Sequence, residues 1–294
     1  MTGEVAALSA ALGFGISTVL ARRFMTAVAP ESGVLVSIAM NVTVFLMLTL
    51  GTIWSAGLPA VNPTSLVLFV LGGLAGTLVG RNLTYMSIAR LGPAMSTSIR
   101  LSNVVFSLAF GLALLRELPR VWQLVGLAIV TAGLWTGVWS RERVPAPARG
   151  GTDVTGIALA LGSAAAFGLG DTMRRMGLAL TPSPVLAAAV GASAALLAHL
   201  LWSTRRHSAR WPQGAALRRT DLWGSAACNT VAILLLLTAL RHTPVAIVSV
   251  LYNLQVLVVL IAGPILLRGE ETIPPGLVLG TLLALAGTTL ILLG

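Results

Sequence analysis

Two stretches of the chain carry polar residues at helical spacing inside otherwise apolar sequence. In the first stretch Thr77, Arg81 and Tyr85 follow one another at steps of four, and Asn82 stands beside Arg81. Residues four apart lie on one face of an α-helix, so these side chains form one polar stripe. A guanidinium in such a stripe can bind a carboxylate or phosphate through two parallel hydrogen bonds. This stretch is therefore a candidate anion site.

A second polar stripe begins shortly after the first and contains Ser96, Arg100, Asn103 and Ser107, spaced by four, three and four residues. At 1.5 Å per residue, Arg81 lies about 12 Å and Arg100 about 9 Å from the membrane surface at which their two predicted helices are joined. Helices joined by a short turn are usually neighbours. We therefore expect both guanidiniums at similar depth in one cavity.

The alternative for each arginine is snorkelling, in which the long side chain reaches from the hydrocarbon region to the lipid headgroups. For Arg81 or Arg100 alone the two interpretations are evenly balanced. Their joint presence, each within a polar stripe, favours the cavity.

The second half of the chain has no matching pair of arginines, but it supplies further candidates for substrate binding: Asn229, Tyr252 and Asn253. Gln255 is another polar residue on the same predicted span as Tyr252 and Asn253. Small polar residues also join helices to one another, and that interpretation stays equally open. Asp171 is followed by Arg174 and Arg175 at helical contact spacing. We expect Asp171 to form a surface or gating ion pair with these arginines, with Asp171 and Arg175 as the gating candidates, or Asp171 to act as a proton-coupling carboxylate.

The composition places these stripes in a membrane. Of 294 residues, 56% are hydrophobic and 10% are charged, and all 19 basic residues are arginine. The net charge of +10 would suggest a nucleic-acid partner in a soluble protein, but the long uncharged stretches exclude nucleic acid here. Since about 20 apolar residues cross a bilayer, the sequence predicts an all-α integral membrane protein.

Hydropathy and chain breakers predict ten transmembrane helices. The predicted spans are Glu4–Ala21, Gly33–Trp54, Leu66–Ala89, Ala94–Leu115, Val121–Ser140, Val154–Met173, Val185–Trp202, Leu222–Leu240, Val245–Leu267 and Gly276–Leu293.

The two halves of the chain repeat the same signals in the same order. The matching pairs are Phe14-Gly15 with Phe167-Gly168, Arg22 with Arg175, Arg90-x-x-Pro93 with Arg241-x-x-Pro244, and Gly126…Ala132-Gly133 with Gly280…Ala286-Gly287. We therefore predict a five-helix repeat over residues 1–140, a linker over 141–153 and a second repeat over 154–294. Because five is odd, the second copy enters the membrane from the opposite side, as in the inverted repeats of many transporters.

At these residues the chain resembles the drug/metabolite transporter superfamily, in its ten-helix branch of paired EamA-type domains. The resemblance covers essentially the whole chain and is carried by Gly92-Pro93-Ala94, Arg100–Phe106, Leu114–Glu117 and Gly126…Ala132-Gly133, and by Pro244, Tyr252-Asn253, Leu266–Glu270 and Gly280…Ala286-Gly287. The family often has a proline just after the positions of Asn103 and Asn253. Val104 and Leu254 stand there instead, so no proline-induced distortion is predicted.

The resemblance implies a transporter, usually an exporter, in the cell (inner) membrane. The chain shows no HExxH, GxSxG or glycine-rich phosphate loop, so we expect neither an enzyme nor a cofactor or metal site. The buried charge is positive, which disfavours export of cationic drugs. We predict a secondary transporter of a small anionic or zwitterionic metabolite, such as an amino acid or another organic acid. Transport is either driven by a proton or solute gradient or passive.

Two alternatives stay open: a carrier or flippase for a lipid headgroup, and a non-transporting membrane interaction protein. We expect contact with membrane lipids and a monomer or homodimer.

The arginines outside the stripes bear on orientation. Connections after the odd-numbered spans hold twelve of them and those after the even-numbered spans hold five. The positive-inside rule then places both termini outside the cytoplasm, whereas the resemblance implies both termini inside. The orientation is therefore left open.

Overall fold

The computed structural model describes residues 2–57, 60–115, 121–142, 153–206, 211–243, 245–267 and 274–293. These residues are almost entirely helical and contain no strand. Most of the predicted linker 141–153 lies outside the described residues, as do Arg116–Glu117, Pro244 and Arg268–Glu270.

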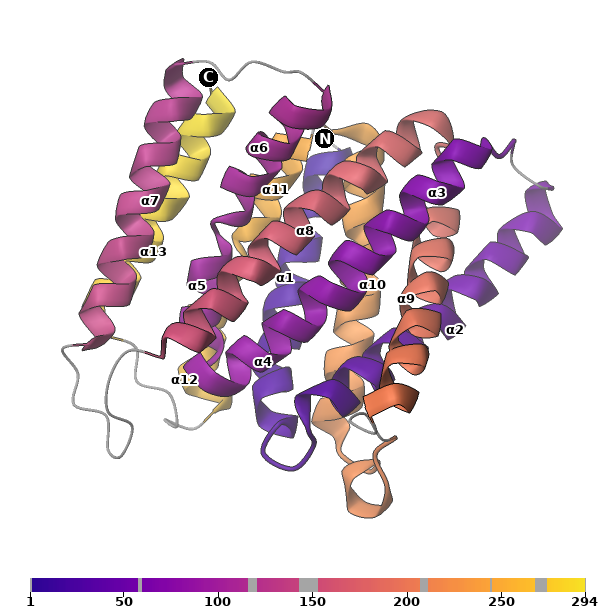
Figure 1. The fold of residues 1–294 in the computed structure, drawn as a ribbon, viewed down its shortest axis with the longest axis horizontal. Helices are drawn as coiled ribbons and strands as arrows, with labels where there is room; N and C mark the ends of the chain where they lie inside the picture. Colours follow the sequence, from indigo (N-terminus) through magenta and orange to yellow (C-terminus); the bar gives the residue numbers. More distant parts are fainter. Residues whose placement is uncertain are drawn as a thin grey trace.

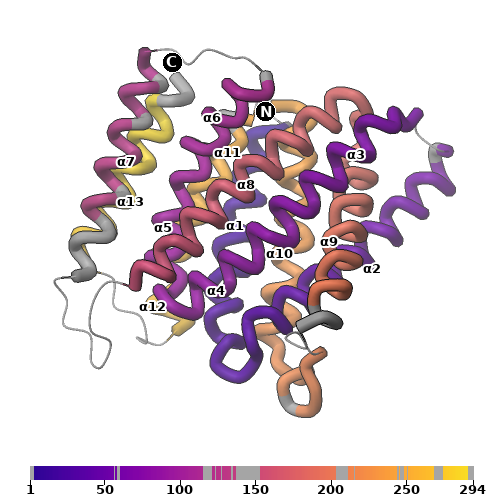
Figure 2. The backbone as a smooth tube through the Cα atoms, in the orientation of Figure 1, coloured from indigo at the N-terminus to yellow at the C-terminus, as the bar shows by residue number. Residues whose placement is uncertain are grey.

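The helices form one bundle, which Figures 1 and 2 show from the same side. Their bounds are α1 (Thr2–Phe24), α2 (Pro30–Ala56), α3 (Pro63–Gly72), the π-helix η1 (Gly73–Gly80), α4 (Arg81–Leu91), α5 (Pro93–Arg100), α6 (Asn103–Leu115), α7 (Val121–Glu142), α8 (Val154–Leu180), α9 (Pro184–Arg206), the 3-10 turn η2 (Gly214–Ala216), α10 (Thr220–His242), α11 (Val245–Asn253), α12 (Gln255–Leu266) and α13 (Pro275–Leu293).

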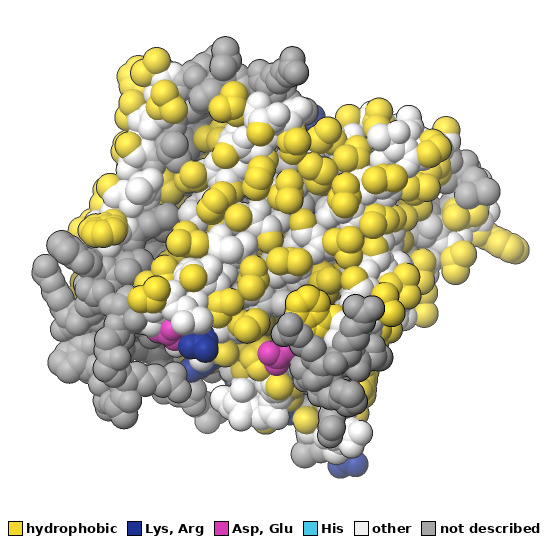
Figure 3. Space-filling model, viewed as in Figure 1, with side chains coloured by type: hydrophobic (Ala, Val, Ile, Leu, Met, Phe, Trp, Pro, Cys, Tyr) yellow, Lys and Arg dark blue, Asp and Glu magenta, His cyan; other side chains and the backbone are white. Residues whose placement is uncertain are grey.

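Several helices begin at a proline, which fits the first helical turn because its missing N–H has no partner there. Within the described ranges, seven helical runs are long and apolar enough to cross a membrane: Gly3–Phe24, Pro30–Ser55, Pro63–Leu91, Pro93–Leu114, Val154–Leu180, Pro184–Trp202 and Thr220–His242. Shorter apolar stretches occupy Leu124–Gly133, Leu251–Leu266 and Pro275–Leu290. The face of the bundle in Figure 3 is correspondingly hydrophobic, and most of its visible charged side chains lie at the lower end.

The sequence prediction was wrong about the end of one span. The helix that begins at Val154 continues to Leu180, beyond the predicted end at Met173. Asp171, Arg174 and Arg175 therefore lie inside α8 rather than at its end. Charged residues suggested a helix end, but here they are accommodated within the bundle.

Two predicted spans are interrupted, although neither has the proline that the family often carries. The first breaks between α5 and α6, where Leu101 and Ser102 donate backbone hydrogen bonds to carbonyls three residues back and the Ser102 hydroxyl bonds the Ile99 carbonyl at 2.8 Å. The second breaks at Leu254, whose N–H bonds the Leu251 carbonyl at 3.3 Å. Such tightened turns at membrane depth are tolerated where protein surrounds the backbone.

The packing of the helices follows one pattern in both halves. α1 packs along α10 and against α11 and α12, and in the same way α8 packs along α3, η1 and α4 and against α5 and α6. The remaining helices pair across the halves, α2 with α9 and α7 with α13. Figure 1 shows α4 and α8 in front of α1 and α10, and α5 in front of α12, so the bundle has two layers around its centre.

Small residues allow the closest of these approaches. A Cβ atom added at Gly73 would lie 2.2 Å from the Gly191 carbonyl oxygen, so only glycine permits this contact between η1 and α9. In the α7–α13 pair the contacts are reciprocal: a Cβ at Gly133 would lie 2.5 Å from Gly280 O, and one at Gly287 would lie 2.7 Å from Gly126 O.

Candidate functional site

A cavity lies between the two layers of the bundle; the space in and around it that is not filled by atoms, open solvent included, is about 600 Å³. Its lining divides into two walls. The charged wall, from η1, α4, α5 and α8, consists of Thr77, Arg81, Thr84, Tyr85, Arg100, Phe167, Asp171 and Arg174. The neutral wall, from α1, α10, α11 and α12, consists of Phe14, Ser17, Thr18, Asn229, Ile233, Leu236, Tyr252 and Gln255.

Arg81 is the first residue of α4, directly after the π-helix, and is 4% exposed. Its guanidinium donates to the Ser37 hydroxyl at 2.7 Å. When the Asn41 amide is oriented to match its neighbours, its oxygen accepts from Arg81 Nη1 at 3.1 Å. Two groups of α2 therefore fix this cation at the cavity, and its remaining N–H groups stay available for an anion.

Arg100 is the last residue of α5, at the break before α6. Its guanidinium carbon lies 4.9 Å from the ring centroid of Phe167, which is a cation–π distance. Within the described part of the chain Arg100 has no hydrogen bond or salt bridge. Of the two predicted arginines, Arg100 is therefore the one with fewer N–H donors engaged in hydrogen bonds.

A third arginine, Arg174, also belongs to the charged wall. Its guanidinium bonds the Asp171 carboxylate at 3.0 Å and the Thr77 hydroxyl at 2.7 Å. Asp171 is 1% exposed, so the interpretation of a surface ion pair is wrong. The glycine at position 76 makes room for this contact, because an added Cβ would lie 3.0 Å from Arg174 Nη1.

The π-helix provides the platform for these contacts. Single π-turns are unusual and often occur at functional sites. Here η1 holds Thr77 toward α8 and ends immediately before Arg81. With three arginines and one aspartate, the charged wall carries a formal excess of two positive charges.

The neutral wall presents amide and hydroxyl groups. Tyr252 accepts a hydrogen bond from the Asn103 side chain, and its ring lies 6.1 Å from that of Phe14 in an edge-to-face arrangement. Asn229 Oδ1 and Gln255 Oε1 are enclosed and accept no hydrogen bond within the described ranges. On the opposite wall the Tyr85 hydroxyl is likewise buried and unbonded there.

The structure brings together in the cavity lining six of the ten residues that the sequence proposed: Arg81, Tyr85, Arg100, Asp171, Asn229 and Tyr252. Asn103 and Asn253 lie just behind the lining, where Asn253 donates to Asn103 Oδ1 at 3.0 Å and so joins the two helix breaks.

The remaining two proposed residues do not line the cavity. Asn82 is half-buried, and its amide nitrogen donates to the Leu78 carbonyl of the preceding π-helix η1 at 2.9 Å. Arg175 points to the end of α10, where it donates to the carbonyls of Leu240 and Arg241. This is the C-terminal contact that a cation makes favourably with a helix.

Arg174 and Gln255 line the cavity but were not among the ten proposed residues. The sequence places Arg174 at contact spacing from Asp171, and the structure shows that pair within α8. Gln255 stands on the same predicted span as Tyr252 and Asn253, three residues after Tyr252, but no spacing pattern singled it out from the other polar residues of that span.

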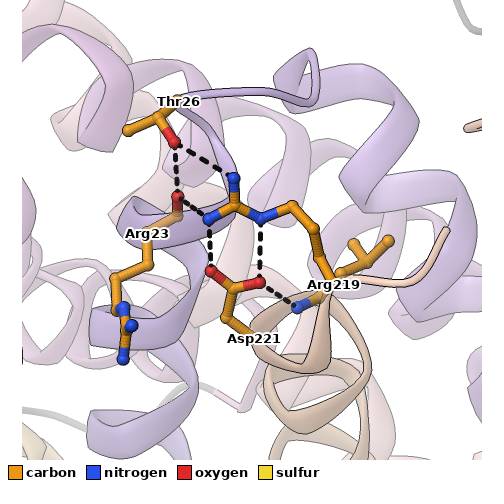
Figure 4. Close-up of polar contacts among 5 residues, drawn as sticks. Arg23, Thr26, Arg219 and Asp221 are labelled. Atoms are coloured by element: carbon orange, nitrogen blue, oxygen red, sulfur yellow. Dashed lines mark hydrogen bonds and ion pairs between the residues drawn. The ribbon is translucent and has the colours of Figure 1, made fainter. Parts of the chain in front are cut away.

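The far end of the neutral wall is fastened by charge, as Figure 4 shows. Arg219, just before α10, bonds both carboxylate oxygens of Asp221, at 3.0 and 2.7 Å, and the Arg23 carbonyl at the end of α1 at 3.0 Å. The pKa of the Arg219 guanidinium is raised, chiefly by its hydrogen bonds to Asp221. We call Arg23, Arg219 and Asp221 the charged clamp.

The corresponding junction of the charged wall uses neutral groups. Thr181, at the end of α8, has its hydroxyl 2.7 Å from that of Ser65 in α3, and it accepts from the Asn62 N–H at 3.1 Å. We call Asn62, Ser65 and Thr181 the neutral clamp. No cluster of three or more His, Cys, Asp or Glu side chains suited to a metal occurs in the described ranges.

Comparison with known proteins finds a matching family model and a solved structure of similar fold. The sequence model of the EamA-like transporter family matches residues 1–138 and 154–293. A solved structure titled only "Crystal structure of protein" superposes with a TM-score of 0.66 at 15% sequence identity, over 99% of this chain and 96% of that one. No curated protein matches the sequence.

Proposed function

Because the chain belongs to the EamA-like transporter family and is a multi-pass membrane protein, we propose that it is a secondary transporter of a small anionic or zwitterionic metabolite. The observation that carries the anionic character is the charged wall, where three arginines face one aspartate. A cavity enclosed by protein screens charge poorly, so the excess positive charge attracts an anion more strongly than it would in water.

The two predicted arginines suit different parts of binding. Arg81 is held by Ser37 and Asn41, which gives a fixed donor at little further entropic cost. Among the residues that the structure describes, only the ring of Phe167 holds Arg100, so this side chain can turn toward a bound group. We place the substrate's acidic group between them, with Tyr85 and Asn229 completing the pocket.

We propose that transport proceeds by alternating access, for which the arrangement of the two halves is suited. We propose two inverted five-helix repeats, residues 1–140 and 154–294, which make ten spans in the cell membrane. Three observations support this arrangement: α1 and α8 pack against corresponding helices, the glycine contacts of α7 and α13 are reciprocal, and Arg22 matches Arg175. Arg22 donates to the Ile88 and Ala89 carbonyls at the end of α4, just as Arg175 does at the end of α10.

Asp171 is the candidate for coupling or gating in this scheme. Its carboxylate lies in the charged wall and already neutralises Arg174. A substrate anion that enters the cavity competes with it for the arginines. A proton or solute gradient would supply the energy, and the family suggests export.

The experiment that tests this function is a binding screen on the purified protein. Thermal unfolding would be followed with amino acids, sugar phosphates and lysolipids, and we expect an acidic metabolite to stabilise the protein. Arg81→Ala and Arg100→Ala should each weaken its binding by roughly tenfold or more, since a hydrogen bond to a charged group contributes about 1.5–3 kcal/mol.

Arg218→Ala is the matched control, because Arg218 is exposed and lies outside the cavity. It removes the same charge and should leave binding unchanged. If binding of every acidic ligand survived both cavity variants, the anion site would have to be abandoned.

A further inference from the structure

The neutral wall holds two buried acceptors that lack donors. Asn229 is 8% exposed and Gln255 is 2% exposed, and their side-chain oxygens accept no hydrogen bond from the described residues. Buried acceptors are almost always satisfied, because an unmade hydrogen bond is costly. Both residues line the same cavity from different helices, α10 and α12. Two such oxygens at one cavity indicate a donor that a ligand supplies.

Building on the proposed function, we propose that Asn229 and Gln255 form a second pole of the substrate site, which accepts hydrogen bonds from an ammonium or hydroxyl group. The anionic group of the same molecule lies against Arg81 and Arg100 on the opposite wall. The substrate is thus bipolar, with an acidic group at one end and a donor group at the other.

The chemistry of the neutral wall fits this pole. Among the lining residues, all four charged side chains belong to the charged wall, so nothing on the neutral wall compensates a second anionic group. The neighbouring rings of Phe14 and Tyr252 present aromatic surface, which attracts a cation. A purely cationic molecule would be repelled by the excess positive charge of the charged wall.

The selectivity of this pole depends on which atom each amide presents. With the oxygens turned toward the ligand, the pole accepts hydrogen bonds from a donor group. With the NH₂ groups inward, it would instead donate to a second carboxylate. The two arrangements predict opposite preferences between zwitterions and dicarboxylates, so binding measurements separate them.

The experiment measures binding of four short carboxylates to the full-length protein in lipid nanodiscs by calorimetry. Butyrate has only the acidic group, 2-aminobutyrate and 4-aminobutyrate add an ammonium at a near or far position, and glutarate adds a second carboxylate. We expect at least one aminobutyrate to bind roughly tenfold or more tightly than butyrate, as expected for a hydrogen bond from a charged donor.

Gln255→Met and Asn229→Leu remove the acceptors while keeping similar volume. Each should abolish that preference and leave butyrate affinity within about twofold of the unmodified protein. The exposed Gln213→Met, outside the cavity, is the control and should retain the preference.

The outcomes distinguish the two proposals. Tighter binding of glutarate than of either aminobutyrate, or a preference that survives both variants, would overturn the acceptor pole while leaving the anion site intact. Failure of all four compounds to bind, or binding that is insensitive to Arg81→Ala and Arg100→Ala, would refute the proposed function and the acceptor pole with it.

Discussion

The two walls of the cavity are built from corresponding helices but carry different chemistry. The charged wall has buried Arg81, Arg174 and Asp171, whereas the neutral wall offers amides, hydroxyls and rings. Phe14 and Phe167, which match each other in the sequences of the two halves, both line the cavity. The backbone packing is thus common to both halves, while the side chains that a substrate meets differ from one wall to the other.

The clamps reverse this distribution of charge. α1 and α10 of the neutral wall are joined by the charged clamp, and α8 and α3 beside the charged wall are joined by the neutral clamp. A strong, partly exposed ion pair therefore fastens one junction, and hydroxyl and backbone groups fasten the other. The difference gives each junction its own dependence on salt.

The largest effect should come from breaking the buried ion pair of the charged wall. Asp171→Ala leaves Arg174 without its carboxylate partner in a site where both side chains are almost fully buried. Removing one partner of a buried pair typically costs about 3–5 kcal/mol. We expect a corresponding loss in the free energy of unfolding, measured by denaturant unfolding in detergent micelles.

The double variant Asp171→Ala with Arg174→Leu should recover part of that loss, because no uncompensated charge remains. Arg90→Ala is the comparison, because it breaks an exposed ion pair in which Arg90 lies 3.4 Å from Asp153. It should lower the free energy of unfolding by about 1 kcal/mol or less. Equal losses for Asp171→Ala and Arg90→Ala would show that burial does not distinguish the charged wall.

A smaller effect is expected from two glycine variants, which test whether α7 and α13 contribute equally to the contact between the two halves. Gly133→Ala and Gly287→Ala each place a methyl group against the backbone of the partner helix, near Gly280 O and Gly126 O. Overpacking of this kind costs about 1–3 kcal/mol. We expect similar losses for the two variants in thermal unfolding.

Gly51→Ala provides the control for these glycines, since an added Cβ there meets nothing within 4 Å. Its effect should be neutral or slightly stabilising, because alanine favours a helix over glycine. A loss confined to one of the two interface glycines would argue against a reciprocal contact.

Much of the fold could be predicted from the sequence because lipid imposes a simple requirement. Every backbone polar group in the hydrocarbon must be bonded within its own helix, so long apolar runs become helices. The interruptions at Ser102 and Leu254 could not be predicted in this way. They arise from a few local hydrogen bonds and from surrounding protein, neither of which hydropathy records.

The candidate site was predicted in part for a related reason. Arg81 and Arg100 stood out because a charge in an apolar helix is costly and needs a polar cavity. Arg174 was passed over because its helix was expected to end at Met173, which would have left it at the surface. Gln255 was one of several polar residues on its predicted span, and nothing in their spacing separated a substrate contact from a contact between helices.

The smallest effect, and the sharpest contrast between the two junctions, lies in the clamps. Arg219→Ala removes both hydrogen bonds to Asp221 and the bond to the Arg23 carbonyl, and Thr181→Val removes the hydroxyl that joins Ser65 and Asn62. Each change should cost about 1 kcal/mol in the free energy of unfolding.

Salt separates the two, since ions screen the partly exposed charged clamp and leave the hydroxyl contacts unaffected. The loss caused by Arg219→Ala should therefore shrink between 0.05 and about 1 M sodium chloride, where the Debye length falls to about 3 Å. The loss caused by Thr181→Val should stay constant over the same range. If both losses responded to salt alike, charge would not be what distinguishes the two junctions.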